Sequence, residues 1–247
     1  TVAHQAPAVD ENNRYLKLSP MADRVRLAYT VYFGEIPGAA ARRRIDRSGD
    51  GLIDDGEARA HGAEVAAEIT PNLEIIADDA PVAVAWAEVH VGLGLATTDA
   101  GSYAVDLIAW LCLPTADRHT VVLRDRVVLP RAGETEIKVE PGPGITIERS
   151  VLGELASQLD LRFHGSGGPL AESGYDLAYR VDRARAVSPA DGRCPGSGTQ
   201  AGAEPARSRW PMVLAVVGLI VIAAGALMLT RRRRVGTGTG TGQNTQG

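Results

Sequence analysis

The stretch 24-RVRLAYTVYF-33 decides the fold of this chain, because apolar and polar side chains alternate along it. One side of the extended backbone would carry the large apolar residues Val25, Leu27, Tyr29, Val31 and Phe33. The opposite side would carry Arg26, Ala28, Thr30 and Tyr32. A period of two residues is that of a β-strand with one face in a core, so the sequence predicts a half-buried strand here.

Similar alternating or β-branched runs recur along the chain as far as residue 181. They lie at 73–76, 82–89, 103–113, 120–129, 136–139, 145–148, 158–163 and 175–181. Turn-forming residues separate them, among them Asp78-Asp79 and the glycines near Gly133 and Gly142. Short strands at this spacing predict a mainly β domain over residues 1–183, built as an antiparallel β-sandwich or as a pair of small antiparallel sheets.

A different pattern interrupts the strands, since 46-DRSGDGLIDDGE-57 fits the twelve-residue calcium loop of an EF-hand. The oxygen ligands would be, in loop order, Asp46, Ser48, Asp50, the Leu52 carbonyl, Asp54 through a water molecule and Glu57 as a bidentate ligand. Gly51 permits the sharp turn at the sixth position, and Ile53 is the apolar spacer at the eighth. We therefore predict a calcium site. The alternative is a solvated acidic turn, because Asp, Ser and Gly also gather in loops through turn chemistry alone.

Short helices are expected on both sides of this loop, within an insertion that covers residues 37–69. Pro37 can begin an entering helix that ends at Ile45. An exiting helix would place on one face Ala58, His61, Gly62, Val65 and Ile69. The sequence contains no second loop of this kind. A lone EF-hand favours a structural or weakly binding site, which another part of the fold must buttress.

The run Pro211 to Thr230, PMVLAVVGLIVIAAGALMLT, has no charged residue and is long enough to cross a bilayer core of about 30 Å. Trp210 before it and the cluster Arg231 to Arg234 after it favour a transmembrane helix at 210–230 over a buried core helix. The arginine cluster predicts a cytoplasmic C-terminus, with residues 1–209 outside the cytoplasm of a bacterial cell. Export needs a signal peptide, which we expect to have been removed or omitted ahead of Thr1.

Two low-complexity segments flank this span. Gly, Pro and Ser dominate residues 184–209, a composition that cannot bury a core and predicts a flexible stalk. Residues 231–247 would form a cytoplasmic tail that is first basic and then Gly/Thr-rich.

Charge and cysteine content narrow the classes of protein that remain. The chain has a formal net charge of −4, and setting aside Arg231 to Arg234 leaves about −8 on the outer part. This charge disfavours nucleic acid and anionic lipid as partners and suits divalent cations. Two cysteines cannot build a disulfide framework, and a bond between Cys112 and Cys194 is not expected, because the first lies in an apolar run and the second in a Gly/Ser/Pro-rich stretch. Packing is the expected role of Cys112.

Patterns typical of catalysis are missing from the sequence. The histidines are dispersed, without a CxxC or HExxH motif, so zinc is not indicated. Asp117, His119, Ser102 and Ser150 have the residue types of a catalytic triad, but they are only moderately close in sequence. A triad is recognised by its geometry, so their sequence positions give no evidence for one. Solvated strand faces account for the acidic residues Glu134, Glu136, Glu148 and Glu154. The sequence predicts no enzyme activity.

Several short motifs between about Asn13 and Ser150 resemble one family. These are 13-NRY-15, 25-VRLAY-29, 34-GEIP-37, the loop at 46–57 and 123-LRD-125. They are similar to the extracytoplasmic N-terminal region of bacterial HupE/UreJ-type and nickel/cobalt-transporter-like membrane proteins. The resemblance implies an exported β-rich domain that bears an acidic metal loop. In that family a polytopic transport part follows, and this sequence has a single span instead, so transport activity is not implied.

These observations lead to one prediction with two alternatives. The chain is expected to be a single-pass membrane protein whose outer β-rich domain binds one calcium ion and acts as a structural or interaction module, with a protein partner that the sequence does not identify. An accessory domain for nickel or cobalt is the first alternative, and it would be expected to recruit imidazoles such as His4 or His61. An exported hydrolase is the second.

Overall fold

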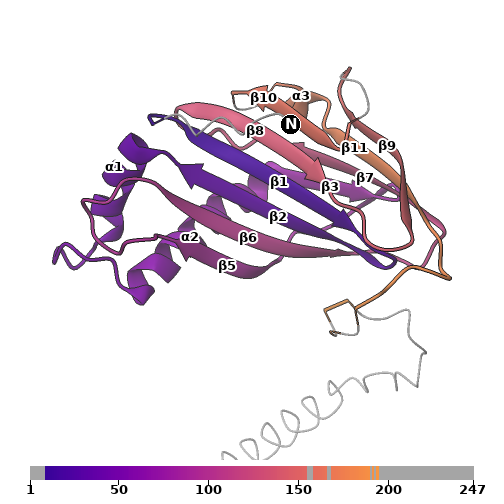
Figure 1. Ribbon diagram of the computed structural model, residues 1–247, viewed down its shortest axis with the longest axis horizontal. Coiled ribbons are helices and arrows are strands. Elements are labelled where there is room, and N and C mark those ends of the chain that lie inside the picture. Colours follow the sequence, from indigo (N-terminus) through magenta and orange to yellow (C-terminus); the bar gives the residue numbers. More distant parts are fainter. Residues whose placement is uncertain (1–8, 155–157, 166–167, 190, 192, 195–247) are drawn as a thin grey trace, which may run out of the picture. The chain divides into compact units, whose positions relative to one another are not determined.

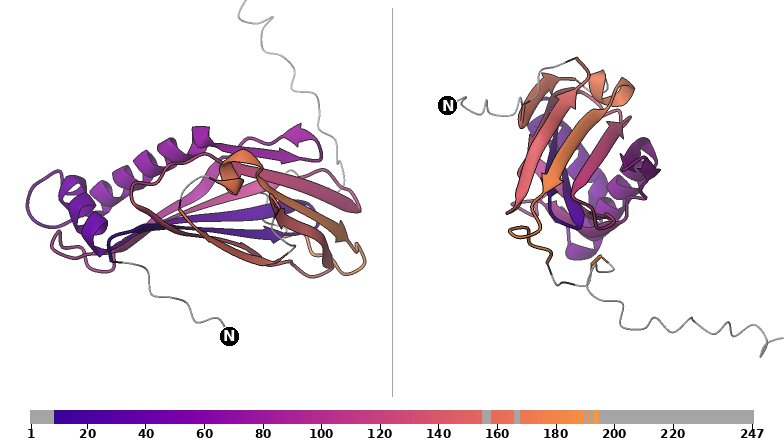
Figure 2. Two further views of the ribbon diagram at one scale, coloured as in Figure 1. Left: turned by 90° about the horizontal axis from the view of Figure 1, so that it is seen from above. Right: turned by 90° about the vertical axis from the view of Figure 1, so that its right-hand side faces the viewer.

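A computed structural model describes residues 9–154, 158–165, 168–189, 191 and 193–194, all of which belong to one compact unit. Two β-sheets make up most of it (Figure 1). The first has the order β10-β8-β1-β2-β6-β5 and the second the order β4-β3-β7-β11-β9. Two views at right angles show the sheets as separate layers, with the helical segment beside them (Figure 2). The predicted mainly β architecture is confirmed.

The strands of the first sheet are β1 (Asn12–Pro20), β2 (Arg24–Phe33), β5 (Trp86–Gly92), β6 (Tyr103–Cys112), β8 (Ala132–Val139) and β10 (Asp160–His164). Those of the second are β3 (Leu73–Ala77), β4 (Ala80–Pro81), β7 (Arg118–Asp125), β9 (Ile145–Leu152) and β11 (Tyr175–Val181). The helices are α1 (Glu35–Ile45), α2 (Asp55–Ile69), the 3₁₀ turn η1 (Thr70–Asn72) and the short α3 (Pro169–Glu172). β2 and β11 have the bounds that the sequence predicts.

Strand β1 is the main departure from the prediction. The sequence patterns did not predict a strand at 12–20, yet β1 lies between β8 and β2 near the middle of its sheet. Its pairing with β8 is parallel, whereas the other pairings among the described strands are antiparallel. The expectation of wholly antiparallel sheets is therefore wrong for this pair.

The core lies between the inward faces of the two sheets and under α2. Val25, Leu27, Tyr29 and Val31 are at most 1% exposed, as the alternation in β2 predicts. Burying a side chain of this size contributes about 1.5–3 kcal/mol relative to leaving it in water. Helix α2 completes the cover over β5, because Gly62 lets the two elements approach closely. A Cβ atom added there would lie 2.8 Å from Val89 Cγ1.

A polar network crosses the core between the sheets. Arg14 on β1 forms an ion pair with Asp125 at the end of β7, with 2.6 Å between Nη1 and Oδ2, and both side chains are 0% exposed. The Tyr29 hydroxyl donates to the same carboxylate oxygen at 2.8 Å, and the Val127 amide donates to the other at 2.8 Å. Burial raises the pKa of Tyr29. A buried charge is tolerated when its partners are present, so these residues are mutually dependent.

We predict strong coupling between Arg14 and Asp125. Arg14→Met or Asp125→Leu alone should lower the free energy of unfolding by about 3–5 kcal/mol, because each leaves buried polar groups without a partner. The double variant should lose clearly less than the sum of the two, as expected for residues in direct contact. Denaturant unfolding of the four proteins measures the coupling, and additive losses would contradict it.

The chain after β11 also packs on this domain. Cys112 at the end of β6 and Cys194 form a disulfide, which corrects the expectation that they would not pair. Residues far apart in sequence meet because Asp191 forms an ion pair with Arg24 on the neighbouring strand β2, at 2.7 Å, and the Pro189 carbonyl accepts from the same guanidinium. Described residues as far as Cys194 therefore contact this domain, past residue 183, where the sequence predicts its boundary.

Reduction should loosen this segment. Brief trypsin treatment of the reduced protein should cleave after Arg193 much faster than in the oxidised protein, since opening the disulfide leaves the segment held by side-chain contacts alone. Mass spectrometry identifies the cut. Cys194→Ser is the matched control, because it should be cut quickly with or without reductant. Equal protection of the oxidised and reduced wild-type proteins would refute the expected effect.

None of the helices in the described part of the chain combines the length and the apolar composition that a membrane crossing needs. The predicted span at 210–230 and the tail at 231–247 lie outside the described residues.

Candidate metal centre

The predicted calcium loop lies between two helices. Helix α1 ends at Ile45 and α2 begins at Asp55, so the intervening residues form the loop. Glu35 in the first turn of α1 and basic residues in its last turn complement the helix dipole. Asp54 caps α2, because its Oδ1 accepts the Gly56 and Glu57 amides at 2.7 and 2.8 Å, and the Glu57 carboxylate accepts the Asp54 amide in turn at 3.1 Å.

Asp46 organises the first half of the loop. Its Oδ1 accepts the Gly49 amide at 2.6 Å and the Ser48 hydroxyl at 3.1 Å, and its Oδ2 accepts the Gly51 amide at 2.9 Å. Gly51 has φ +85°, a left-handed conformation that glycine adopts without strain. Desolvation alone would raise the pKa of Asp46, but the amide and hydroxyl donors outweigh it and hold this pKa below its ordinary value.

Glu57 joins the end of the loop to its beginning. Its Oε1 accepts the amides of Arg47 at 2.7 Å and Ser48 at 2.9 Å. Ser48 therefore contacts Asp46 through its hydroxyl and Glu57 through its amide. The structure brings together three of the predicted ligand residues, those for the first, third and twelfth loop positions.

The other predicted ligands take local roles. Asp50 accepts the Leu52 amide at 2.9 Å, and Asp54 remains the cap of α2. The carboxylates of the four predicted acidic ligands all accept backbone amides. The described residues contain no group of three or more His, Cys, Asp or Glu side chains arranged to hold a metal ion. Coordination would thus use oxygen atoms, above all those of Glu57, that now accept amide hydrogens.

A second segment lies against the loop, between β5 and β6. The Ile53 amide donates to the Ala96 carbonyl at 2.8 Å, and the Thr98 amide donates to the Gly51 carbonyl at 3.1 Å. Leu52 forms an isolated antiparallel bridge with Thr97. The Ile53 side chain is 4% exposed and joins the core. The sequence predicted a need for such a buttress but did not identify the segment, because the contact is between residues about 45 positions apart and neither side has a strand pattern.

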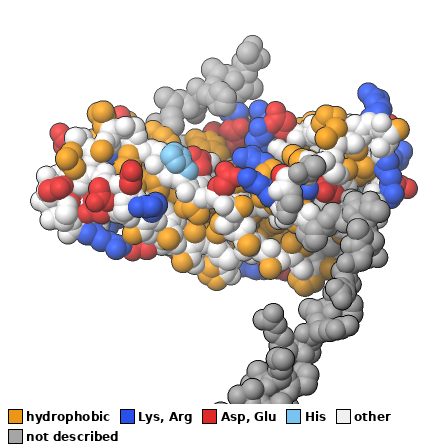
Figure 3. Space-filling model, turned by 90° about the horizontal axis from the view of Figure 1, so that it is seen from below, with side chains coloured by type: hydrophobic (Ala, Val, Ile, Leu, Met, Phe, Trp, Pro, Cys, Tyr) orange, Lys and Arg blue, Asp and Glu red, His pale blue; other side chains and the backbone are white. Residues whose placement is uncertain are grey.

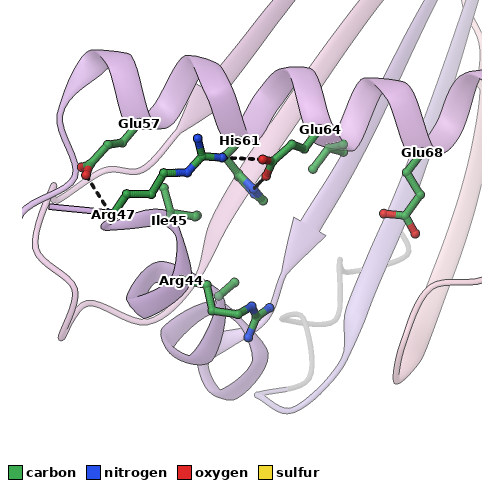
Figure 4. Close-up of a pocket in the computed structure, with 9 residues that line it drawn as sticks. Arg44, Ile45, Arg47, Glu57, His61, Glu64 and Glu68 are labelled. Carbon is green, nitrogen blue, oxygen red and sulfur yellow. Dashed lines mark hydrogen bonds and ion pairs between the residues drawn. The ribbon is translucent and has the colours of Figure 1, made fainter. Parts of the chain in front are cut away.

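A cavity of about 220 Å³ lies between α1 and α2, next to Glu57 (Figure 4). Arg47 crosses its mouth and forms an ion pair with Glu64. His61 is half-buried, and its Nε2 lies 2.9 Å from the Tyr103 hydroxyl. Burial lowers the pKa of His61, so its imidazole is neutral at neutral pH. The sequence predicted His61 on the inward face of this helix but not its pairing with Tyr103.

Residues considered for a catalytic triad do not come together. His119 Nδ1 lies 2.7 Å from Asp78 Oδ2, a pairing that sequence reasoning missed, and Asp117 forms an ion pair with Arg183. Ser150 contacts the Tyr175 hydroxyl at 2.6 Å. Burial raises the pKa of Tyr175 to about 12. Asp78 lies in a turn and has φ +49°. The sequence indicated only a turn at Asp78-Asp79 and gave no sign that Asp78 pairs with His119.

Comparisons with protein-family models and with curated proteins found no match to this chain. The resemblance to HupE/UreJ-type proteins therefore stays a prediction.

The low pKa of Asp46 gives a testable pH dependence. In the folded protein the carboxyl should titrate below the value of an unfolded chain, so its contribution to stability is complete above the unfolded pKa and is lost as pH falls through the folded pKa. Carbon-detected NMR of the side-chain carboxyl measures the midpoint. Ser48→Ala removes one donor and should move the midpoint upward, whereas a midpoint at the ordinary value in the wild type would contradict the hydrogen-bonded arrangement.

Proposed function

We propose that the loop at 46–57 binds one calcium ion and that the domain is a calcium-stabilised structural or interaction module. The contact of Ser48 with both Asp46 and Glu57 supports this proposal, since it brings residues from the two ends of the loop next to each other. The donor set of the loop is oxygen throughout, as calcium prefers. Gly51 in the left-handed region matches the sixth position of the motif.

Calcium would act here by holding elements together. The loop joins α1 to α2, α2 covers β5, and Ile53 reaches the core. An ion that neutralises the loop carboxylates would stabilise this arrangement in proportion to its preference for the folded loop. An exported site can work at dissociation constants of about 10⁻⁴ to 10⁻³ M, so weak binding suffices.

Nickel or cobalt handling is the alternative, and the position of His61 separates it from calcium. Nickel favours imidazole ligands. His61 lies on α2, outside the loop, and its Nε2 is engaged with Tyr103. A nickel site would need imidazole ligands from outside the loop, whereas the loop itself contains the oxygen-bearing side chains that calcium prefers. Calcium is therefore the better-supported ion.

The membrane-anchored location is proposed from the sequence alone, on the uncharged run Pro211 to Thr230 and the arginines after it. The described domain is compatible with a partner other than nucleic acid. On the face shown in Figure 3, acidic and basic side chains are intermixed with apolar ones, unlike the basic surface that phosphate backbones require.

Calorimetric titration of the purified chain with calcium tests the proposal. Glu57→Gln should abolish or strongly weaken binding, because it removes one anionic oxygen but keeps an acceptor for the Arg47 and Ser48 amides. Asp46→Ala should do the same, and Ser48→Asp should tighten binding by adding an acidic ligand. Calcium at 100 times the dissociation constant should add about 2.7 kcal/mol of stability, which appears as a higher melting temperature.

Glu68→Gln is the matched control, since Glu68 lines the cavity on the same helix but lies outside the loop. It should bind like the wild type. A parallel titration with nickel, with His61→Ala as its probe, tests the alternative. A folded wild-type protein that gives neither heat nor a thermal shift at millimolar calcium, with Glu57→Gln indistinguishable from it, would show that the loop is an acidic turn.

A further inference from the structure

Arg42 on α1 is fully buried, and no carboxylate of the described residues lies within ion-pair distance of it. Its guanidinium instead donates to five backbone carbonyls of one segment. Nε donates to Gly101, Nη1 to Leu95 and Thr97, and Nη2 to Leu93 and Ser102. A guanidinium has five N–H donors, so all of them are used within the segment 93–102. None remains for an anion, which excludes a role for Arg42 in binding one.

The same segment is the one that lies against the calcium loop. Ala96 accepts the Ile53 amide and Thr98 donates to the Gly51 carbonyl. These two bonds flank Leu52, whose carbonyl is the predicted ligand at the seventh loop position. They fix the backbone from which that carbonyl projects.

Arg42 also reaches the other end of the site. Its own carbonyl accepts the Asp46 amide at 3.0 Å, so the residue lies one helical turn before the first ligand. Helix α1 approaches the segment closely at Gly38, where an added Cβ atom would lie 2.6 Å from the Gly101 carbonyl oxygen. One arginine thus connects the start of the calcium loop to the segment that supports its middle.

We propose that segment 93–102 takes the place of the second EF-hand that a paired site would have, and that Arg42 is the positioning residue that holds it against the calcium loop. This inference rests on the proposed calcium binding. Positioning acts through the backbone of Gly51 to Ile53, and Arg42 itself makes no contact with the ion. Losing supporting groups of this kind typically costs about 10- to 100-fold in metal affinity.

The test compares Arg42→Lys with Arg43→Lys in the full chain. Lysine keeps the charge but offers one ammonium in place of the planar fork, so it cannot reach all five carbonyls. Arg43 is the adjacent residue on α1 and is exposed. Arg42→Lys should raise the calcium dissociation constant about 10- to 100-fold, and Arg43→Lys should leave it unchanged. Hydrogen exchange at the amides of Ile53 and Thr98 should be faster in Arg42→Lys alone.

Thr98→Pro is the second variant, for the case that Arg42→Lys does not fold. It removes the amide that donates to Gly51, and it also fixes the backbone at residue 98 and restricts Thr97. It should therefore weaken calcium binding as well, whereas Thr98→Ala, which keeps the amide, should not. Linkage requires that calcium in turn slows exchange at Ile53 and Thr98 in the wild type.

The outcomes separate the two proposals. Wild-type calcium binding together with unchanged affinity in folded Arg42→Lys, or in Thr98→Pro, overturns the positioning role and leaves calcium binding intact. Failure of the wild type to bind calcium overturns both.

Discussion

The ion pair between Arg14 and Asp125 is the constraint on which the arrangement of the two sheets depends. Each residue belongs to a different sheet, and neither side chain has access to water. The Arg14 guanidinium is charged and buried, and the Asp125 carboxylate is the charged group at hydrogen-bond distance from it, so this pair favours the offset of the sheets that places β1 over the end of β7. Apolar contacts alone would allow sliding, since they are not directional. The Tyr29 hydroxyl and the Val127 amide also donate hydrogen bonds to the Asp125 carboxylate and restrict its position further.

This ion pair also explains what sequence patterns reveal and what they hide. β2 was predicted because its inward positions are all apolar. β1 presents Arg14, Leu16 and Leu18 to the core, and an arginine at an inward position breaks the alternation by which strands are recognised. The predicted strand at 120–129 ends at Asp125 for the same reason, because this carboxylate turns inward and accepts the Val127 amide. The disulfide between Cys112 and Cys194 was missed because its formation depends on which segments lie side by side in the fold. The spacing of the two cysteines in the sequence does not reveal this.

The candidate metal centre also has features that the sequence predicted and features that it did not. The bounds of its two helices and the left-handed Gly51 follow from local chemistry, and the sequence located the helix ends to within three residues. The partner segment 93–102 could not be predicted, since its contacts use backbone groups that every residue possesses. The role of Arg42 could not be predicted either, because it is one of three consecutive arginines in the sequence. Only its burial in the structure distinguishes it from Arg43 and Arg44.

The link between Cys112 and Cys194 has a mechanical consequence. A pull on the chain beyond Cys194 passes through the disulfide directly into the end of β6, and residues 113–193 carry none of the tension. The load then falls on the ladders that join β6 to β2 and to β5, and in the first of these every residue from Arg24 to Phe33 is paired. Strands β7, β9 and β11, which come between the two cysteines in sequence, are enclosed in a covalent loop and shielded from the force. The part of the second sheet that is formed by β7, β11 and β9 thus stays outside the path of the force when the domain is held under tension from its C-terminal side.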